Sequence, residues 1–287
     1  MAIILVTGSS TGIGQEAALH MARKGHQVYA AVRSPATATE LRDKIAAEDL
    51  PARIIKLDLL DTASIDSAVA DIMAREGRID ALVNNAGIGA GQSVEETPLE
   101  VVREIFETNY FGTVSVLRAV TPIMRKQRSG RIVNVGSLAG RVVMGHHAHY
   151  SASKWAMEGM SEALAFEMAE FNVRVSIIQP GCTVTPMWGK GSAPERETPY
   201  ANSLQRLVRF FEFGLGRPAM PADVAVAIAD AIESDNPHFR YPVGLDAVET
   251  IAARNKVSDD EWIAANCLQG DAFAERMAEL VGVDYYR

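Results

Sequence analysis

TGSSTGIG, at residues 7–14, stands between the apolar run IILV at residues 3–6 and a segment of helical periodicity from about Ile13 to Lys24. Its glycines, Gly8, Gly12 and Gly14, permit positive φ angles and let backbone N–H groups approach a pyrophosphate at a helix N-terminus. The stretch therefore predicts a phosphate-binding strand, turn and helix. The simpler alternative is a tight turn that needs only two glycines.

Outward from this turn, short β-branched runs alternate with helical patterns. The predicted strands are residues 3–8, 27–33, 53–58, 80–87, 131–137, 173–181 and 238–244. The predicted helices are 13–24, one ending near 48, one ending near 77, 98–127, 150–171 and 221–234. Such alternation forces parallel strands with right-handed crossovers, so we predict an α/β fold, a doubly wound parallel sheet of the Rossmann type. Ligands should bind at the carboxyl ends of the strands.

The regular alternation stops after Gly181. Residues 1–245 form the predicted Rossmann-fold domain, in which residues 185–220 make an excursion long enough to predict a substrate lid. Residues 246–287 form a C-terminal extension packed on the same domain, with helical periodicity near 271–281. Apolar side chains of the excursion either line a lipophilic cleft or pack a lid helix onto the core; they are Met187, Trp188, Leu207, Phe210, Phe211 and Phe213.

Composition excludes several classes of protein. The 287 residues, 48% of them hydrophobic, suffice for one large α/β domain. A net charge of −8 without a Lys/Arg-rich run argues against nucleic-acid or membrane partners. The N-terminal apolar run is too short for a signal segment or a membrane span. Two cysteines, Cys182 and Cys267, make no disulfide framework, and no Cys/His set has metal-ligand spacing, so we expect no metal and a cytoplasmic location.

Four polar residues point to proton and hydride chemistry: Asn109, Ser137, Tyr150 and Lys154. Tyr150 and Lys154, at i and i+4 of YSASK, would share one helix face. A phenol has a pKa of about 10, but a nearby cation and a positively charged oxidised nicotinamide favour phenolate and draw that pKa toward neutrality. Tyr150 could then act as a general acid or base while Ser137 holds the substrate oxygen.

These motifs together resemble the classical short-chain dehydrogenase/reductase family over roughly residues 1–245, and VYAAVR, TNYFG and RYPVG resemble its hydroxysteroid and retinol dehydrogenase-like branch. The resemblance implies that Tyr150 is the acid/base and that Ser137 positions the carbonyl. It also implies that Lys154 lowers the tyrosine pKa and binds the nicotinamide ribose, and that Asn109 holds a water that relays protons to Lys154. The cofactor-binding residues that it implies are Gly8, Ser10, Gly12, Ile13, Gly14, Arg33, Asp58, Leu59, Asn85, Ala86, Gly87, Tyr150, Lys154, Pro180, Gly181, Val184 and Thr185.

The cofactor type depends on the end of the second strand. NAD-binding sites of this kind place an acidic residue there, whereas this chain has Val32 followed by Arg33, whose guanidinium could clamp a 2′-phosphate. This favours NADP, with NAD possible, although Thr11 stands where many NADP-binding relatives carry a basic residue.

The sequence thus predicts an NADP(H)-dependent oxidoreductase that interconverts an alcohol and a ketone or aldehyde, on a lipophilic small molecule, as a homodimer or homotetramer. An epimerase or dehydratase with transient hydride transfer, or a non-catalytic nucleotide sensor, remains open. The histidines before Tyr150, at 146, 147 and 149, suit substrate-loop contacts or exposure better than metal binding. Cys182 is expected to pack beside the nicotinamide pocket.

Overall fold

The chain folds around one parallel sheet of seven strands in the order β3-β2-β1-β4-β5-β6-β7. The computed structural model describes residues 1–89, 91–186, 198–282 and 284. The strands are β1 Ile3–Thr7, β2 Gln27–Val32, β3 Ala52–Lys56, β4 Ala81–Asn84, β5 Gly130–Val135, β6 Val173–Pro180 and β7 Arg240–Val243. Each adjacent pair is parallel, which confirms the predicted doubly wound sheet.

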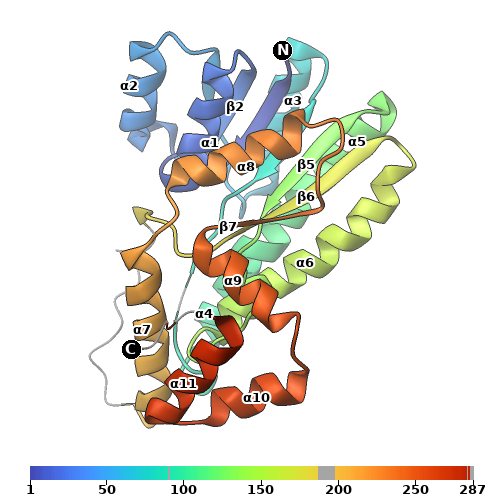
Figure 1. Ribbon diagram of the computed structural model, residues 1–287. Helices are drawn as coiled ribbons and strands as arrows, with labels where there is room; N and C mark the ends of the chain where they lie inside the picture. Colours follow the sequence, from blue (N-terminus) through green and yellow to red (C-terminus); the bar gives the residue numbers. More distant parts are fainter. Residues whose placement is uncertain (90, 187–197, 283, 285–287) are drawn as a thin grey trace.

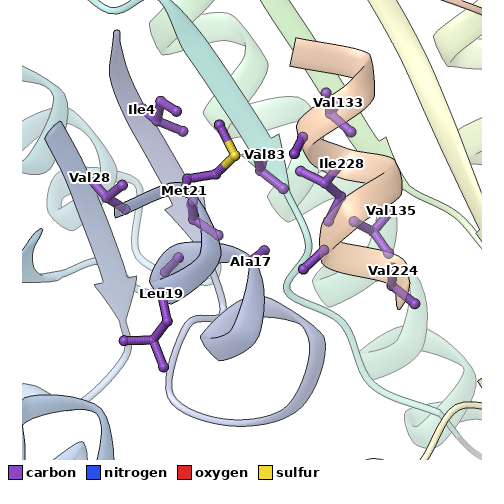
Figure 2. Close-up of a cluster of buried hydrophobic side chains, with 14 of the residues drawn as sticks. Ile4, Ala17, Leu19, Met21, Val28, Val83, Val133, Val135, Val224 and Ile228 are labelled. Carbon is purple, nitrogen blue, oxygen red and sulfur yellow. The ribbon is translucent and has the colours of Figure 1, made fainter. Parts of the chain in front are cut away.

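Helices cover both faces because successive strand residues point to opposite sides. In β1, Ile4 and Val6 belong to a core beneath α1 (Gly12–Arg23) and α8 (Pro221–Glu233). Figure 2 shows Ile4 of this core together with Met21 of α1 and Ile228 of α8. Ile3 and Leu5 belong to the core on the opposite face. The helices that contribute to that opposite core are α3 Thr62–Glu76, α5 Thr113–Gln127 and α6 Ala148–Ala169. The chain also contains α2 Thr39–Ala47 and the 3₁₀ turns Pro35–Thr37, before β3, and Leu138–Gly140, between β5 and α6.

The long helix predicted for residues 98–127 is interrupted. It consists of α4 (Leu99–Phe106), a π-helical turn (Glu107–Gly112) and α5. Periodicity alone does not reveal the extra residue of a π turn, because the flanking helices keep their apolar pattern. The turn packs closely against the loop after β3, since a Cβ on Gly112 would lie 2.7 Å from the Cβ of Leu59.

The excursion after β6 contains α7, Ala201–Gly216. Its two ends are joined, because Thr183 and Ala219 form a parallel bridge in which Val184 N–H donates to the Ala219 carbonyl at 3.2 Å. Residues 187–197, with Met187 and Trp188, lie outside the described residues. The excursion therefore leaves the domain and returns to it at the carboxyl end of β6.

The C-terminal tail holds three helices where the sequence predicted one. They are α9 Leu245–Arg254, α10 Asp259–Cys267 and α11 Gly270–Val281, and Figure 1 shows them with α7 at one end of the molecule. A third apolar cluster joins Leu138 and Val142 of the loop after β5, Phe210 of α7, and tail residues that include Trp262 and Phe273. The capping box of Ser258 and Glu261 was the sequence signal for the start of α10. Of the described helices, none is long and apolar enough to cross a membrane.

Candidate active site

The glycine turn between β1 and α1 forms an open cradle. Gly8 and Gly12 have φ angles of 68° and 62°, which side chains other than glycine rarely adopt. A Cβ on Gly14 would collide with the Asn85 side chain and the Gly8 carbonyl oxygen. Thr11 at the N-cap of α1 makes no side-chain capping hydrogen bond, and the first turn of α1 carries no acidic residue. The N-terminal amides of α1 therefore suit an anionic group such as a pyrophosphate.

The segment after β4 supports this turn. The Asn85 amide donates to the carbonyls of Thr7 and Gly8 at 3.0 and 3.2 Å. The Thr7 hydroxyl accepts from the backbone N–H groups of Asn85 and Ala86 at 3.0 and 3.2 Å. Sequence reasoning assigned Asn85, Ala86 and Gly87 to cofactor binding. It did not predict that Thr7, inside the motif TGSSTGIG, supports this segment through its hydroxyl. These bonds hold the carboxyl ends of β1 and β4 together.

The end of β2 lies against the same turn, because Ser9 N–H donates to the Ala31 carbonyl at 3.0 Å. Arg33 follows β2 directly and is exposed, and within the described ranges it forms no ion pair. At the end of β3, the Asp58 carboxylate accepts from Leu60 N–H at 3.1 Å. The predicted residues Arg33 and Asp58 thus follow the carboxyl ends of β2 and β3, the two strands on one side of β1.

The predicted quartet is brought together by β5, α6 and the π turn. Ser137 follows β5, and its hydroxyl is hydrogen-bonded to the phenol of Tyr150. Lys154, one helical turn beyond Tyr150, is buried and donates to the Val135 carbonyl at 3.0 Å. Its Nζ lies 5.8 Å from the centroid of the Tyr150 ring. The spacing in YSASK therefore does place phenol and ammonium on one face of a helix.

Burial dominates the electrostatics of the quartet. Burial raises the pKa of Tyr150, while the hydrogen bond with Ser137 acts in the opposite direction. Burial also lowers the pKa of Lys154 to about 8. Within the protein alone, desolvation therefore disfavours both charged forms, and the lowering of the phenol pKa by Lys154 together with an oxidised nicotinamide stays a prediction. A further positive charge near the phenol, such as that of an oxidised nicotinamide, would lower the pKa of Tyr150.

Asn109 lies in the π turn and is fully buried. Its side-chain oxygen accepts from Ile88 N–H at 2.8 Å, and its amide donates to the Ile88 carbonyl at 2.9 Å and to the Ser153 hydroxyl at 3.0 Å. Both amide donors are therefore used in tying the segment after β4 to α6. A Cβ on Gly87 would lie 3.1 Å from the Asn109 oxygen and 3.7 Å from Lys154 Nζ, so Gly87 closes this side of the site.

The histidines before Tyr150 have different surroundings. The His147 ring stacks on the Tyr150 ring, and Phe211 of α7 meets it edge to face. The His146 ring nitrogen Nε2 is 3.1 Å from the Tyr200 carbonyl, and His149 Nε2 is buried without a hydrogen-bond partner. Within the described part of the chain, no group of three or more His, Cys, Asp or Glu could hold a metal ion.

The segment after β6 closes the site opposite α6. Thr185 approaches the glycine turn, since a Cβ on Gly12 would lie 3.3 Å from its Cγ2, whereas Val184 is exposed. Pro180 is buried at the end of β6, and Gly181 N–H donates to the Val243 carbonyl at 2.9 Å. Cys182 is buried in the third apolar cluster, as expected from the sequence, and desolvation together with Asp246 raises the pKa of its thiol.

Comparison with known proteins identifies the class of this site. A profile of the short chain dehydrogenase family matches residues 2–196, so the chain belongs to the short-chain dehydrogenase family. This confirms the resemblance read from the motifs. Members are oxidoreductases that use NAD(P) and act on CH–OH or carbonyl groups of small molecules, and the chain is an oxidoreductase of this kind.

Individual relatives cover nearly the whole chain. It is 35% identical to a 3-ketodihydrosphingosine reductase of Bacteroides thetaiotaomicron, over 93% of this chain and 95% of that protein. It is 32% identical to retinol dehydrogenase 8 of Homo sapiens, over 84% of this chain and 81% of that protein. The crystal structure of a short-chain dehydrogenase from Streptomyces avermitilis aligns with a TM-score of 0.80 at 35% identity, over 92% of this chain and 97% of that one.

Proposed function

We propose that the protein is an NADP(H)-dependent oxidoreductase that interconverts an alcohol and a ketone or aldehyde on a lipophilic substrate. One observation carries the proposal: the Tyr150 phenol, hydrogen-bonded to Ser137, stands one helical turn from the buried ammonium of Lys154. These groups lie at the carboxyl edge of the sheet, as does the glycine turn. A proton-transferring phenol beside a dinucleotide cradle is the arrangement that hydride transfer requires.

In this proposal each side chain has one task. Tyr150 gives a proton to the carbonyl oxygen in reduction and takes it from the hydroxyl in oxidation, and Ser137 holds that same oxygen through its hydroxyl. When bound, the nicotinamide supplies hydride chemistry at the reacting carbon and, in its oxidised form, the positive charge that favours phenolate. Lys154 binds the ribose hydroxyls and supports the phenolate. Asn109 holds the water that passes protons to Lys154; its side-chain amide donors are used, and its backbone carbonyl accepts from the Thr113 hydroxyl at 2.9 Å and keeps a second lone pair for the water.

Arg33 supports NADP as the cofactor, with NAD as the second possibility. Arg33 is exposed directly after β2, the strand next to β1, and β2 ends without a carboxylate that could accept from ribose hydroxyls. Asp58 and Leu59 border the adenine, while Pro180, Gly181, Val184 and Thr185 border the nicotinamide. Gly8, Ser10, Gly12, Ile13 and Gly14 receive the pyrophosphate.

Two observations support a lipophilic substrate. Phe211 of the α7 excursion reaches the ring that stacks on Tyr150, and like Phe210 and Phe213 it also packs with the third apolar cluster. The names of two relatives refer to 3-ketodihydrosphingosine and to retinol, both of which carry long hydrocarbon parts. We also propose a homodimer or homotetramer, since Trp155 and Phe166 of α6 and Phe111 of the π turn are each about half or more exposed. We further propose a cytoplasmic location, in line with the two free cysteines.

The test is a screen of lipophilic ketones and alcohols in which NADPH and NADH absorbance are followed in parallel. Net oxidation of reduced cofactor, lost in Tyr150→Phe, supports the proposal. Turnover without net change of cofactor redox state would favour an epimerase or dehydratase. Cofactor binding with no turnover of any compound would favour a nucleotide sensor.

A further inference from the structure

The stacking partner of Tyr150 is a histidine with unused hydrogen-bonding groups. The ring centroids of His147 and Tyr150 are 4.6 Å apart, with 25° between the planes. Phe211 covers the same imidazole edge to face, with its centroid at 5.6 Å and 84° between the planes. The imidazole thus stands between the proposed acid/base and the apolar wall contributed by α7.

The backbone fixes the position of this ring. His147 is the N-cap residue of α6, and its carbonyl accepts from Ser151 N–H at 2.9 Å. It also bridges to Gln92, in the segment after β4. These contacts fix the backbone of His147, and the contacts with the rings of Tyr150 and Phe211 orient its imidazole.

The ring nitrogens have no hydrogen-bond partner among the residues that the structure describes. Burial lowers the pKa of His147 to about 4, so the imidazole is neutral near pH 7 and offers one N–H donor and one nitrogen acceptor. The His147 residue is partly exposed rather than fully buried, so its nitrogens are open to a ligand as well as to water. A group that both donates and accepts, such as a hydroxyl, complements a neutral imidazole on either of its nitrogens.

We infer that His147 is a specificity-determining residue that binds a hydroxyl carried by the substrate close to its reacting carbon. The inference rests on the proposed function of Tyr150. The ring centroids are 4.6 Å apart, so one small substrate can reach both rings. In this proposal the oxygen held by Tyr150 and the second oxygen held by His147 lie on neighbouring carbons. The preferred substrate is an apolar molecule with a hydroxy-ketone or diol head.

The test compares a matched pair of substrates, phenyl ethyl ketone and its α-hydroxy derivative, with reduced cofactor at saturation. We expect the wild type to prefer the hydroxy ketone. His147→Phe keeps the aromatic stack and removes both nitrogens, so it should lower kcat/KM for the hydroxy ketone roughly 5- to 150-fold and leave the plain ketone nearly unchanged. His147→Gln restores a donor and an acceptor and should regain part of the preference.

The control is His146→Asn. The His146 ring lies against the Tyr200 carbonyl and not against Tyr150, and asparagine tolerates the positive φ of 59° at this position. It should leave the preference unchanged. Binding of the two corresponding alcohols to enzyme saturated with reduced cofactor, measured by calorimetry, gives a readout without turnover.

A wild type without preference in either readout, or equal losses for both ketones in His147→Phe, would overturn the inference. Loss of turnover in Tyr150→Phe supports the proposed function whatever His147 does, so failure of the inference and failure of the proposed function can be told apart.

Discussion

The imidazole of His147 lies face to face with the phenol of Tyr150, at a centroid distance of 4.6 Å. The sequence places them three residues apart, and the first turn of α6 brings the two rings together. The contact removes solvent from one face of the phenol and adds no positive charge, because burial keeps the imidazole neutral near pH 7. Charge support for a phenolate is thus left to Lys154 and to the bound cofactor.

Replacement of Tyr150 by phenylalanine removes only the phenolic oxygen. We expect kcat to fall by roughly 10²-fold or more with cofactor affinity nearly unchanged, because the proton donor is lost and the cradle stays intact. Steady-state kinetics and cofactor titration measure the two effects. Near-wild-type turnover on any accepted substrate would show that Tyr150 is not the acid/base.

Lys154→Met removes a charge and a proposed ribose contact together. We expect the cofactor KM to rise and kcat to fall, and the basic limb of the pH profile for alcohol oxidation to move to higher pH. Relative to the variant, the free energy of unfolding of the wild type should also rise between about pH 8 and 10.5. In this range the folded chain has already released the Lys154 proton while the unfolded chain still binds it. A basic limb that does not move would contradict the electrostatic role of Lys154.

Arg33→Ala tests the cofactor proposal. Loss of a partly exposed contact to a 2′-phosphate should raise KM for NADPH roughly 10- to 150-fold and leave NADH nearly unaffected. Adding Val32→Asp should make NADH the preferred cofactor, since a carboxylate repels the phosphate and accepts from a ribose hydroxyl. Equal weakening of both cofactors, or a wild type that already prefers NADH, would exclude the clamp.

His147→Phe has a stability signature that is independent of activity. The folded pKa of about 4 lies below the ordinary value of 6.5, so the unfolded chain binds a proton first as the pH falls. Between pH 7 and 4.5 the wild type should therefore lose about 2 kcal/mol more stability than the variant. Urea unfolding at the two pH values measures the difference. Equal losses in both proteins would mean that the imidazole titrates normally.

Gly14→Ala tests the cradle. The added methyl group meets the backbone carbonyl of Gly8, which cannot move aside as a side chain could, so we expect a loss of about 1–3 kcal/mol and weaker cofactor binding. The matched control is Gly159→Ala in α6, where a Cβ meets nothing within 4 Å. That variant should gain about 0.5–1 kcal/mol. Thermal unfolding and cofactor titration compare the two variants, and equal behaviour would show that Gly14 has room for a side chain.

The fold was predictable from sequence because its signals are local. The apolar run of β1 alternates between two buried faces, and glycines mark the turn that follows it. Signals that depend on distant partners were missed. The π turn around Asn109 is held by contacts with Ile88, which no local period records. Helix α10 packs into the third apolar cluster, and its one local signal is the capping box of Ser258 and Glu261, which periodicity does not include.

The sequence by itself determined the parallel sheet, the glycine turn and the placement of Tyr150 and Lys154 on one helix face, since each follows from spacing along a few neighbouring residues. Only the tertiary structure decided the charge balance of the site, because burial of Tyr150 and Lys154 depends on what packs around them. It likewise decided that His147 faces the phenol while His146 turns to Tyr200. Desolvation and the direction of a ring are properties of the assembled neighbours, which spacing along the chain does not contain.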